Sequence, residues 1–252
     1  MTATFLEVSG VSKSYGGVQA LAGCSLRVRR GEVAGLIGPN GSGKTTLFNV
    51  ITGYERVRQG TVSYEDRRIT NSRPDKIFKL GIARTFQLDR VFGQLTALEN
   101  VLVATQSGTG WIRSMMQTKG SAAQRQRAMD ALEFMGLGAL ANLPAGKLSY
   151  GQRRLLEIAF VLVTEPRVIL LDEPTAGINA RLVDQLAGKI VELNRLGTTF
   201  LVVEHNMAFV MDLCTSVTVL DRGCHLVSGE PEVVRSDPRV LDAYLGGGKE
   251  PR

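Results

Sequence analysis

The sequence predicts an α/β protein with a parallel sheet, an antiparallel β region in front of it and an inserted helical region. Two segments carry this prediction. Val33–Ile37 and Val168–Leu171 are continuous apolar runs, as expected of strands that are covered on both faces. The first run leads through a glycine-rich loop, Gly38–Gly43, into a helical segment that ends near Gly53. A strand, a glycine loop and a helix in this order open a parallel α/β sheet.

The composition fits one globular domain with an insertion. The 252 residues are 44% hydrophobic and 21% charged, which excludes a wholly disordered chain. The net charge of +6 allows an anionic partner, which can be a nucleotide, a nucleic acid or a membrane surface. No apolar run approaches the ~20 residues that cross a bilayer, and the N-terminus lacks a signal-peptide pattern. Three cysteines without a CxxC pair predict a reducing compartment rather than a disulfide framework.

Ahead of the first buried strand, the chain predicts short strands separated by turns. Phe5–Val8, Val11–Tyr15 and Cys24–Val28 alternate weakly between apolar and polar residues. Turns are marked by Gly16–Gly17 and by Gly31. We expect these strands to form an N-terminal antiparallel β subdomain.

The middle of the chain predicts an α-helical subdomain over residues 88–163. It contains no strong strand candidate, whereas Leu98–Thr105 and Ala122–Met135 show helical spacing. Between these helices, Ser107–Gly120 is rich in Gly, Ser and Thr and predicts a loop. The expected division of the single domain, 1–252, is a core over 1–87 and 164–245, the helical subdomain over 88–163, and a flexible tail over 246–252.

The last third returns to alternating strands and helices. Ala180–Leu196 has the apolar spacing of an amphipathic helix, and Gly197 is its stop signal. Strands are predicted at Thr199–Val203 and Val217–Leu220. Together with the two buried runs, they complete the predicted parallel sheet.

The glycine-rich loop has the pattern GxxxxGK[ST], which is typical of a phosphate loop. Its glycines allow successive backbone N–H groups to point at phosphate oxygens, and the helix N-terminus adds about half a positive charge. A glycine-rich turn that does not bind phosphate could also match this pattern. The strand before the loop and the helix after it make that alternative less favoured. The predicted fold class is therefore a P-loop NTPase core. We expect the Thr45 hydroxyl to bind Mg²⁺. The predicted nucleotide ligands here are Gly38, Pro39, Asn40, Gly41, Ser42, Gly43, Lys44, Thr45 and Thr46.

The second buried strand ends in two carboxylates, Asp172 and Glu173. The carboxyl end of such a strand lies where α/β folds bind ligands. Because consecutive strand residues point to opposite sides, the two carboxylates cannot do the same task. We expect Asp172 to hold Mg²⁺ and Glu173 to orient or polarise the attacking water. An ordinary strand end has the same pattern, but beside a phosphate loop the pair favours nucleotide hydrolysis.

The segment Leu148–Gln152 reads LSYGQ and precedes a helix, Arg153–Val163, that is apolar almost all round. Ser149 and Gln152 fit an S-x-x-Q capping box, so an ordinary helix start also explains the segment. Together with the phosphate loop and the Asp-Glu strand, it resembles the LSGGQ signature of the ATP-binding cassette (ABC) ATPases. Tyr150 replaces the third letter of that signature.

The resemblance implies further site residues. Tyr15 takes the position of an aromatic that stacks on adenine, and Gln87 that of a glutamine that reaches Mg²⁺ and water. His205 takes the position of a histidine that contacts the γ-phosphate. Outside the family, each would be an ordinary structural or surface residue. The implied catalytic residues are Glu173, His205, Gln87 and Lys44; the metal ligands are Thr45, Gln87 and Asp172; and Ser149, Gly151 and Gln152 bind the ATP of a second subunit.

One position departs from the general family pattern. Asn179 stands where many ABC ATPases have an aspartate that helps to link the two sites of a dimer. Asparagine still donates and accepts hydrogen bonds but carries no charge. In the ATPases of branched-chain amino-acid importers, the subgroup that the chain resembles most, asparagine is usual at this position.

The resemblance also implies how the protein works. Two subunits, identical or different, close head-to-tail around two ATP molecules, and Leu88–Leu98 contacts transmembrane permease subunits. The strings GIARTFQ (81–87), LTALENV (95–101) and LLDEPTAGIN (170–179) look like the ATPase of branched-chain amino-acid importers; related ATPases serve urea, amides or lipopolysaccharide. We therefore expect an ATPase subunit at the cytoplasmic face of the inner membrane, with ATP and Mg²⁺ as cofactors, an indirect link to a solute-binding protein and no nucleic acid.

Two other classes of function share the phosphate loop. A soluble ABC ATPase that acts on DNA or the ribosome usually carries a coiled coil, a zinc insertion or a second cassette. We find none of these in the 252 residues. A P-loop GTPase is disfavoured because the sequence has no NKxD motif. The remaining basic residues, among them Arg67, Arg68, Arg153 and Arg154, are expected near the inner leaflet or in solvated surface.

Overall fold

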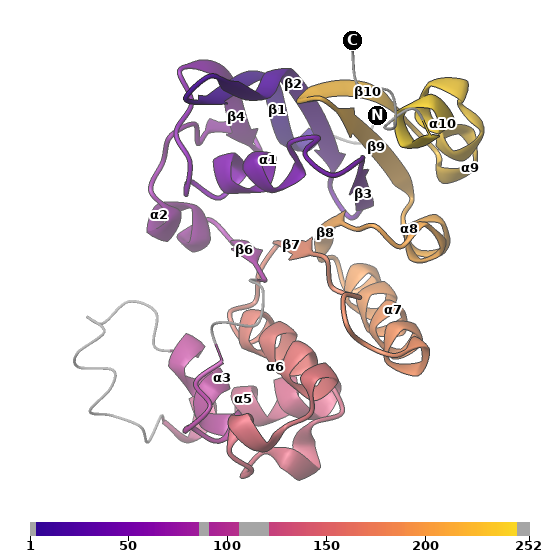
Figure 1. Cartoon of the computed structure of the whole chain (residues 1–252). Coiled ribbons are helices and arrows are strands. Elements are labelled where there is room, and N and C mark those ends of the chain that lie inside the picture. Colours follow the sequence, from indigo (N-terminus) through magenta and orange to yellow (C-terminus); the bar gives the residue numbers. More distant parts are fainter. Residues whose placement is uncertain (1–3, 86–90, 106–120, 246–252) are drawn as a thin grey trace. The chain divides into compact units, whose positions relative to one another are not determined.

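The computed structural model describes residues 4–85, 91–105 and 121–245 (Figure 1). The predicted loop over Ser107–Gly120, the tail after residue 245 and Gln87 lie outside the described residues. The contacts within the chain divide it into two units. Unit 1 comprises Met1–Ala83, Arg167–Pro174 and Val191–Arg252, and unit 2 comprises Arg84–Pro166 and Thr175–Ile190.

Unit 1 opens with an antiparallel sheet whose strands lie in the order β2-β1-β4-β5. The sequence predicted two short strands where β1 is continuous. Gly10, with φ 60°, lies at a shift in the pairing register between Val8 and Val11, so the strand bends there without ending. The strands are β1 (Thr4–Tyr15), β2 (Val18–Arg29), β4 (Gln59–Tyr64) and β5 (Arg67–Arg68).

The second sheet has the order β10-β9-β3-β8-β7-β6. β3 pairs in parallel with β8 and β9, β8 pairs in parallel with β7, and β10 is antiparallel to β9. Every residue of β3, β7 and β8 is buried, which confirms the continuous apolar runs as central strands. The bounds are β3 (Val33–Ile37), β6 (Ile82–Arg84), β7 (Val168–Asp172), β8 (Thr199–Val203), β9 (Ser216–Asp221) and β10 (Cys224–Gly229).

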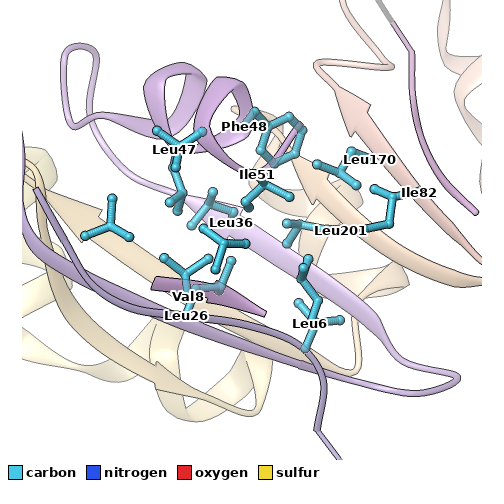
Figure 2. Packing of buried hydrophobic residues seen from close by; sticks show 14 of the residues in the cluster. Leu6, Val8, Leu26, Leu36, Leu47, Phe48, Ile51, Ile82, Leu170 and Leu201 are labelled. Atoms are coloured by element: carbon cyan, nitrogen blue, oxygen red, sulfur yellow. The ribbon is translucent and has the colours of Figure 1, made fainter. Parts of the chain in front are cut away.

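One hydrophobic cluster joins the strands of both sheets to helix α1 (Lys44–Ile51) (Figure 2). The helix contributes Leu47, Phe48 and Ile51, which are completely buried. Each such side chain stabilises the fold by about 1.5–3 kcal/mol through its burial. Because α1 follows the glycine-rich loop directly, this packing fixes where the loop ends. The other helices of unit 1 are α2 (Pro74–Lys79), α8 (Met207–Leu213), α9 (Pro231–Ser236) and α10 (Pro238–Leu245).

Unit 2 is helical in the part that the structure describes. The helices predicted over Leu98–Thr105 and Ala122–Met135 are confirmed with ends shifted by one residue. The unit contains α3 (Ala97–Thr105), α5 (Ala122–Phe134), α6 (Tyr150–Leu162), the 3₁₀ turns Gly138–Leu140 and Ala145–Lys147, and most of α7 (Ala180–Arg195).

The structure corrects one expectation about the basic surface. Arg154 is only 4% exposed and forms an ion pair with the equally buried Glu157, at 2.9 Å. It lies one turn into α6, on the face that packs inward. Arg154 therefore does not belong to a membrane-facing or solvated surface, whereas Arg67 and Arg68 of β5 are exposed.

Candidate nucleotide-binding site

Three parallel strands bring the predicted site residues to one edge of the sheet. Val203, the last residue of β8, lies opposite Leu36 of β3 on one side and Asp172 of β7 on the other. The segments that follow these strands therefore leave the sheet side by side, at the edge where α/β folds bind ligands. They are the glycine-rich loop after β3, Glu173 after β7 and His205 after β8.

The shape of the glycine-rich loop depends on neighbouring strands. Gly38 has φ 152° and Gly43 has φ 101°, values that favour glycine. A Cβ atom at Gly38 would lie 2.1 Å from the carbonyl oxygen of Leu220, and one at Gly43 would lie 2.5 Å from that of Ala20. Both neighbours are backbone atoms of β9 and β2, which cannot move aside easily. The two glycines are therefore required both by conformation and by space.

Lys44, the first residue of α1, turns its ammonium group back onto the loop. Its Nζ atom donates hydrogen bonds to the carbonyl oxygens of Gly38 at 2.8 Å and Pro39 at 2.9 Å. Burial lowers the pKa of Lys44, while the charges of Glu173 and Asp172 act in the opposite direction. The cation is thus held between the phosphate loop and the two carboxylates predicted from the sequence.

The carboxylates after β7 differ in environment, as the alternation of strand residues predicted. Asp172 is 6% exposed, whereas the side chain of Glu173 is 30% exposed. Glu173 has a positive φ of 46°, and its backbone N–H donates to the carbonyl of Val203 at 2.9 Å. Its Oε1 atom lies 2.8 Å from Nε2 of His205. The structure therefore brings Glu173 and His205 together although 32 positions separate them in the chain.

Two supporting residues were not singled out from the sequence. The carboxylate of Glu204 is buried and accepts hydrogen bonds from the backbone N–H groups of His205 at 2.9 Å and Asn206 at 3.2 Å. Asn206 in turn caps α8 by accepting a bond from the N–H of Phe209 at 3.2 Å. These contacts fix the backbone of the histidine. A carboxylate directly after a buried strand, the same signal that identified Asp172, could have revealed Glu204.

Tyr15 lies beside the first turn of α1. Its hydroxyl lies near the side chains of Glu55 and Thr46, and burial together with Glu55 raises the pKa of Tyr15. The ammonium of Lys13 lies 4.9 Å from the ring centroid, yet the tyrosine remains 44% exposed. Thr45, next to Lys44, is also exposed. An exposed ring next to the helix N-terminus can stack on a planar group.

The C-terminal helix also reaches the phosphate loop. A cavity of about 510 Å³ lies between Pro39–Ser42, the turn after β9 and residues Arg239, Asp242 and Ala243 of α10. Tyr244 of the same helix lies next to the backbone of Gly38, and burial raises the pKa of Tyr244. No local pattern in the sequence indicates this contact.

The signature segment begins helix α6 in unit 2. Oγ of Ser149 accepts a bond from the N–H of Gln152 at 3.2 Å, and Oε1 of Gln152 accepts one from the N–H of Ser149 at 2.9 Å. The capping box indicated by the sequence is therefore present. Gly151 lies against Leu182 of α7.

Comparison with known proteins agrees with this geometry. Residues 21–176 match the family described as ABC transporter, and residues 225–250 match a family described as branched-chain amino acid ATP-binding cassette transporter. The first match includes the phosphate loop, the signature segment and the Asp-Glu strand. The chain therefore belongs to the ABC transporter family, and it is an ATPase of that family. The resemblance stated from the motifs is confirmed.

Its relatives identify the branch of the family more narrowly. The chain is 39% identical to the high-affinity branched-chain amino acid transport ATP-binding protein LivG of Salmonella typhimurium, over 98% of this chain and 99% of LivG. It is equally similar to BraF of Pseudomonas aeruginosa, which bears the same description.

Solved structures confirm the P-loop NTPase fold. The ADP conformation of an ATP-binding cassette of an ABC transporter has a TM-score of 0.88 and 36% identity, over 97% of this chain and all of that one. A dimeric cassette in a post-hydrolysis state, bound to ADP and Pi, has a TM-score of 0.78 and 27% identity, over 90% of this chain and 98% of that one.

Proposed function

We propose that the chain is the ATP-hydrolysing subunit of an importer for branched-chain amino acids or a similar small polar solute. The observation that carries the proposal is the convergence of the phosphate loop, Glu173 and His205 at one sheet edge. The proposed cargo class rests on two findings. The relatives are named for branched-chain amino acid transport, and residues 225–250 match the family described as branched-chain amino acid ATP-binding cassette transporter. The ATPase subunit of an importer binds nucleotide and not the transported solute. The partner subunits therefore determine which solute is transported.

The phosphate loop and Lys44 bind the phosphates of ATP in this proposal. The backbone N–H groups after Gly38 face the anion, and the buried ammonium exchanges its two carbonyl contacts for phosphate oxygens. Tyr15 stacks on the adenine, because its ring is exposed beside the first turn of α1. Pro39, Asn40, Gly41, Ser42, Gly43, Thr45 and Thr46 complete the nucleotide contacts.

The donor atoms next to Lys44 fit Mg²⁺. This ion prefers oxygen ligands and usually takes only one or two from protein, with phosphate and water supplying the rest. The Thr45 hydroxyl and the Asp172 carboxylate are such ligands, and Gln87 is a third candidate outside the described residues. Among residues 4–85, 91–105 and 121–245, no cluster of three His, Cys, Asp or Glu side chains forms a separate metal site. Bound with the nucleotide, Mg²⁺ neutralises charge on its phosphates.

Glu173 and His205 act on the attacking water and the γ-phosphate. The Glu173 carboxylate is partly exposed, so it can accept a hydrogen bond from water and orient it for in-line attack. The His205 imidazole, 2.8 Å away, holds this carboxylate in place in the absence of nucleotide, and its ring N–H can move from the carboxylate to a phosphate oxygen when nucleotide binds. Glu204 fixes the histidine backbone, so the pair is preorganised before nucleotide arrives.

A second ATPase subunit completes each site. The N-terminus of α6, capped by Ser149 and followed by Gly151 and Gln152, is a ready anion site and would receive the γ-phosphate held by the partner. The dimeric relative supports this arrangement. No helix in the described ranges is long and apolar enough to cross a membrane. We propose that Leu88–Leu98 contacts transmembrane permease subunits, at the cytoplasmic face of the inner membrane, and that a solute-binding protein delivers the cargo.

The hydrolysis roles are tested with Glu173→Gln. We expect this variant to bind ATP, to lose turnover by ~10²–10⁴-fold, and to accumulate ATP-dependent dimers, because the water is no longer activated. Glu232→Gln, an exposed glutamate on α9, is the matched control and should keep wild-type turnover. Full turnover in Glu173→Gln would refute the assigned role.

The transport role is tested in cells that lack the gene. Uptake of labelled leucine, isoleucine and valine should be restored by the wild-type chain and not by Glu173→Gln. Purification from native membranes should recover permease subunits together with the chain. Restored uptake of urea or an amide instead would assign a different cargo, and recovery of DNA or ribosomes would refute the transporter assignment.

A further inference from the structure

The signature turn, defined here as Ser149–Gln152, packs against a loop that is distant in sequence. The ring of Tyr150 lies directly on Gly177. A Cβ atom at Gly177 would be 2.8 Å from Cε1, 3.0 Å from Cζ and 3.2 Å from Oη of that tyrosine. Gly177 also has φ 71°, a conformation that favours glycine. A side chain at position 177 is therefore excluded both by its backbone and by the ring above it.

The next residue of the signature turn makes the opposite kind of contact. A Cβ atom at Gly151 would lie 2.9 Å from Cδ2 of Leu182 and 3.6 Å from Cγ2 of Ile178. The two surfaces are thus complementary. The Tyr150 ring fits over Gly177, and the side chains of Ile178 and Leu182 fit over Gly151. Such interlocking surfaces do not slide past each other without repacking.

The facing segment is itself held firmly. We call Thr175–Asn179 the coupling loop. Oδ1 of Asn179 accepts a hydrogen bond from the N–H of Leu182 at 3.0 Å and so caps the first turn of α7. The N–H of Ile178 donates to the carbonyl of Thr175 at 3.3 Å and closes the loop on itself. Asn179, which departs from the general family pattern, therefore serves here as a helix cap.

We propose that Tyr150 is a positioning residue that couples the signature turn to the coupling loop within one subunit. The proposal rests on the function above, in which the signature turn engages the ATP of a partner subunit. Gly177 follows Glu173 by only four positions in the chain. When the signature turn engages the partner's nucleotide, the ring carries that displacement to the loop that continues from the subunit's own hydrolytic glutamate. A glycine at position 150 could not transmit it.

A purely structural role for Tyr150 gives a different expectation. The residue is 37% exposed and is the first residue of α6, so it contributes little to the core. A packing residue of this kind would change thermal stability and leave the dependence of turnover on ATP concentration unaltered. A coupling residue instead changes the maximal rate and the cooperativity, and leaves the affinity of an isolated subunit for ATP unaltered.

The experiment measures ATP turnover by the reconstituted complex for Tyr150→Ala and Tyr150→Phe. We expect Tyr150→Ala to lower kcat about tenfold and to bring the Hill coefficient towards one, within the usual 5- to 150-fold range of coupling between sites. ATP affinity of the isolated subunit should stay at the wild-type value. Tyr150→Phe keeps Cε1 and Cζ, the ring atoms nearest to Gly177, and should restore kcat. Should Tyr150→Ala fold poorly, Tyr150→Leu replaces it in the same assays.

A double substitution tests the contact itself. Gly177→Ala alone should lower kcat because its methyl group collides with the ring, and it should cost less in the Tyr150→Ala background. Additive effects, or wild-type kcat and cooperativity in folded Tyr150→Ala, would overturn the proposal. Ser149→Arg separates this inference from the function on which it rests. If that variant still dimerises with ATP and turns over normally, the shared site is wrong, whatever Tyr150 does.

Discussion

The phosphate loop allows a quantitative test of the structure with three glycine substitutions. Gly43 and Gly197 have nearly the same backbone conformation, with φ 101° and 102°. They differ in their surroundings, because a Cβ atom at Gly43 would lie 2.5 Å from the Ala20 carbonyl oxygen, whereas nothing lies within 4 Å of one at Gly197. Gly188 lies inside α7 with equally open space. The three positions therefore separate conformational strain from steric collision.

The expected magnitudes follow from these surroundings. Gly197→Ala should lower the free energy of unfolding by about 1–2 kcal/mol, the cost of a left-handed conformation for a residue with a Cβ. Gly43→Ala adds a collision about 1 Å inside normal contact, which costs a further ~1–3 kcal/mol, as in other overpacked sites. Gly188→Ala should raise the free energy of unfolding by about 0.8–1 kcal/mol, because alanine is the better helix former.

The assay is urea unfolding followed by circular dichroism, together with titration of a fluorescent ATP analogue. Only Gly43→Ala should also weaken nucleotide binding, since Gly43 is the only one of the three in the loop. If Gly43→Ala is no more destabilising than Gly197→Ala, the close approach of β2 to the phosphate loop is refuted. If Gly188→Ala destabilises the protein, the space around Gly188 is not open.

Three further predictions concern other elements. Asn179→Ala should lower the free energy of unfolding by about 1 kcal/mol through loss of a helix cap, and Asn179→Asp should retain stability in denaturant unfolding; equal losses would contradict the capping role. Burial raises the pKa of Cys24 and Cys214 from 9.0 to about 12. The thiols of the unfolded chain therefore lose their protons at lower pH than those of the folded chain. The free energy of unfolding should fall as the pH rises from about 9 to 12. In a thiol-labelling assay of the native protein, the exposed Cys224 should react first, and equal rates for all three thiols would contradict this burial. Tyr15→Ala should weaken ATP binding several-fold by loss of ~1 kcal/mol of stacking, whereas Tyr15→Phe should not, as measured by equilibrium titration.

Much of the site could be predicted from sequence because its residues follow strands with strong local signals. The phosphate loop, Asp172 and Glu173 each come directly after a continuous apolar run, and such runs form central strands whatever surrounds them. The capping box at Ser149 is equally local, since it needs only two residues three positions apart.

Features that depend on distant partners could not be predicted in this way. β4 pairs with β1, a strand distant in the sequence, and is only partly buried, so its alternation is weak. The contact of Tyr150 with Gly177 joins positions that no periodicity relates. The approach of Tyr244 to Gly38 joins positions that are more distant still. Each arises from tertiary packing, which a local pattern does not encode.

The strand order of the parallel sheet has a consequence for how the protein is made. β3, which carries the phosphate loop, pairs only with strands that are synthesised late, since Val33 lies opposite Phe200 and Ala34 opposite Ser216. A nascent chain emerges at about 5–20 residues per second, and pairings between distant positions form slowly. The nucleotide site therefore assembles only after β8 and β9 have left the ribosome, and a chain that stops before Thr199 contains every phosphate-loop residue but lacks both strands that pair with β3.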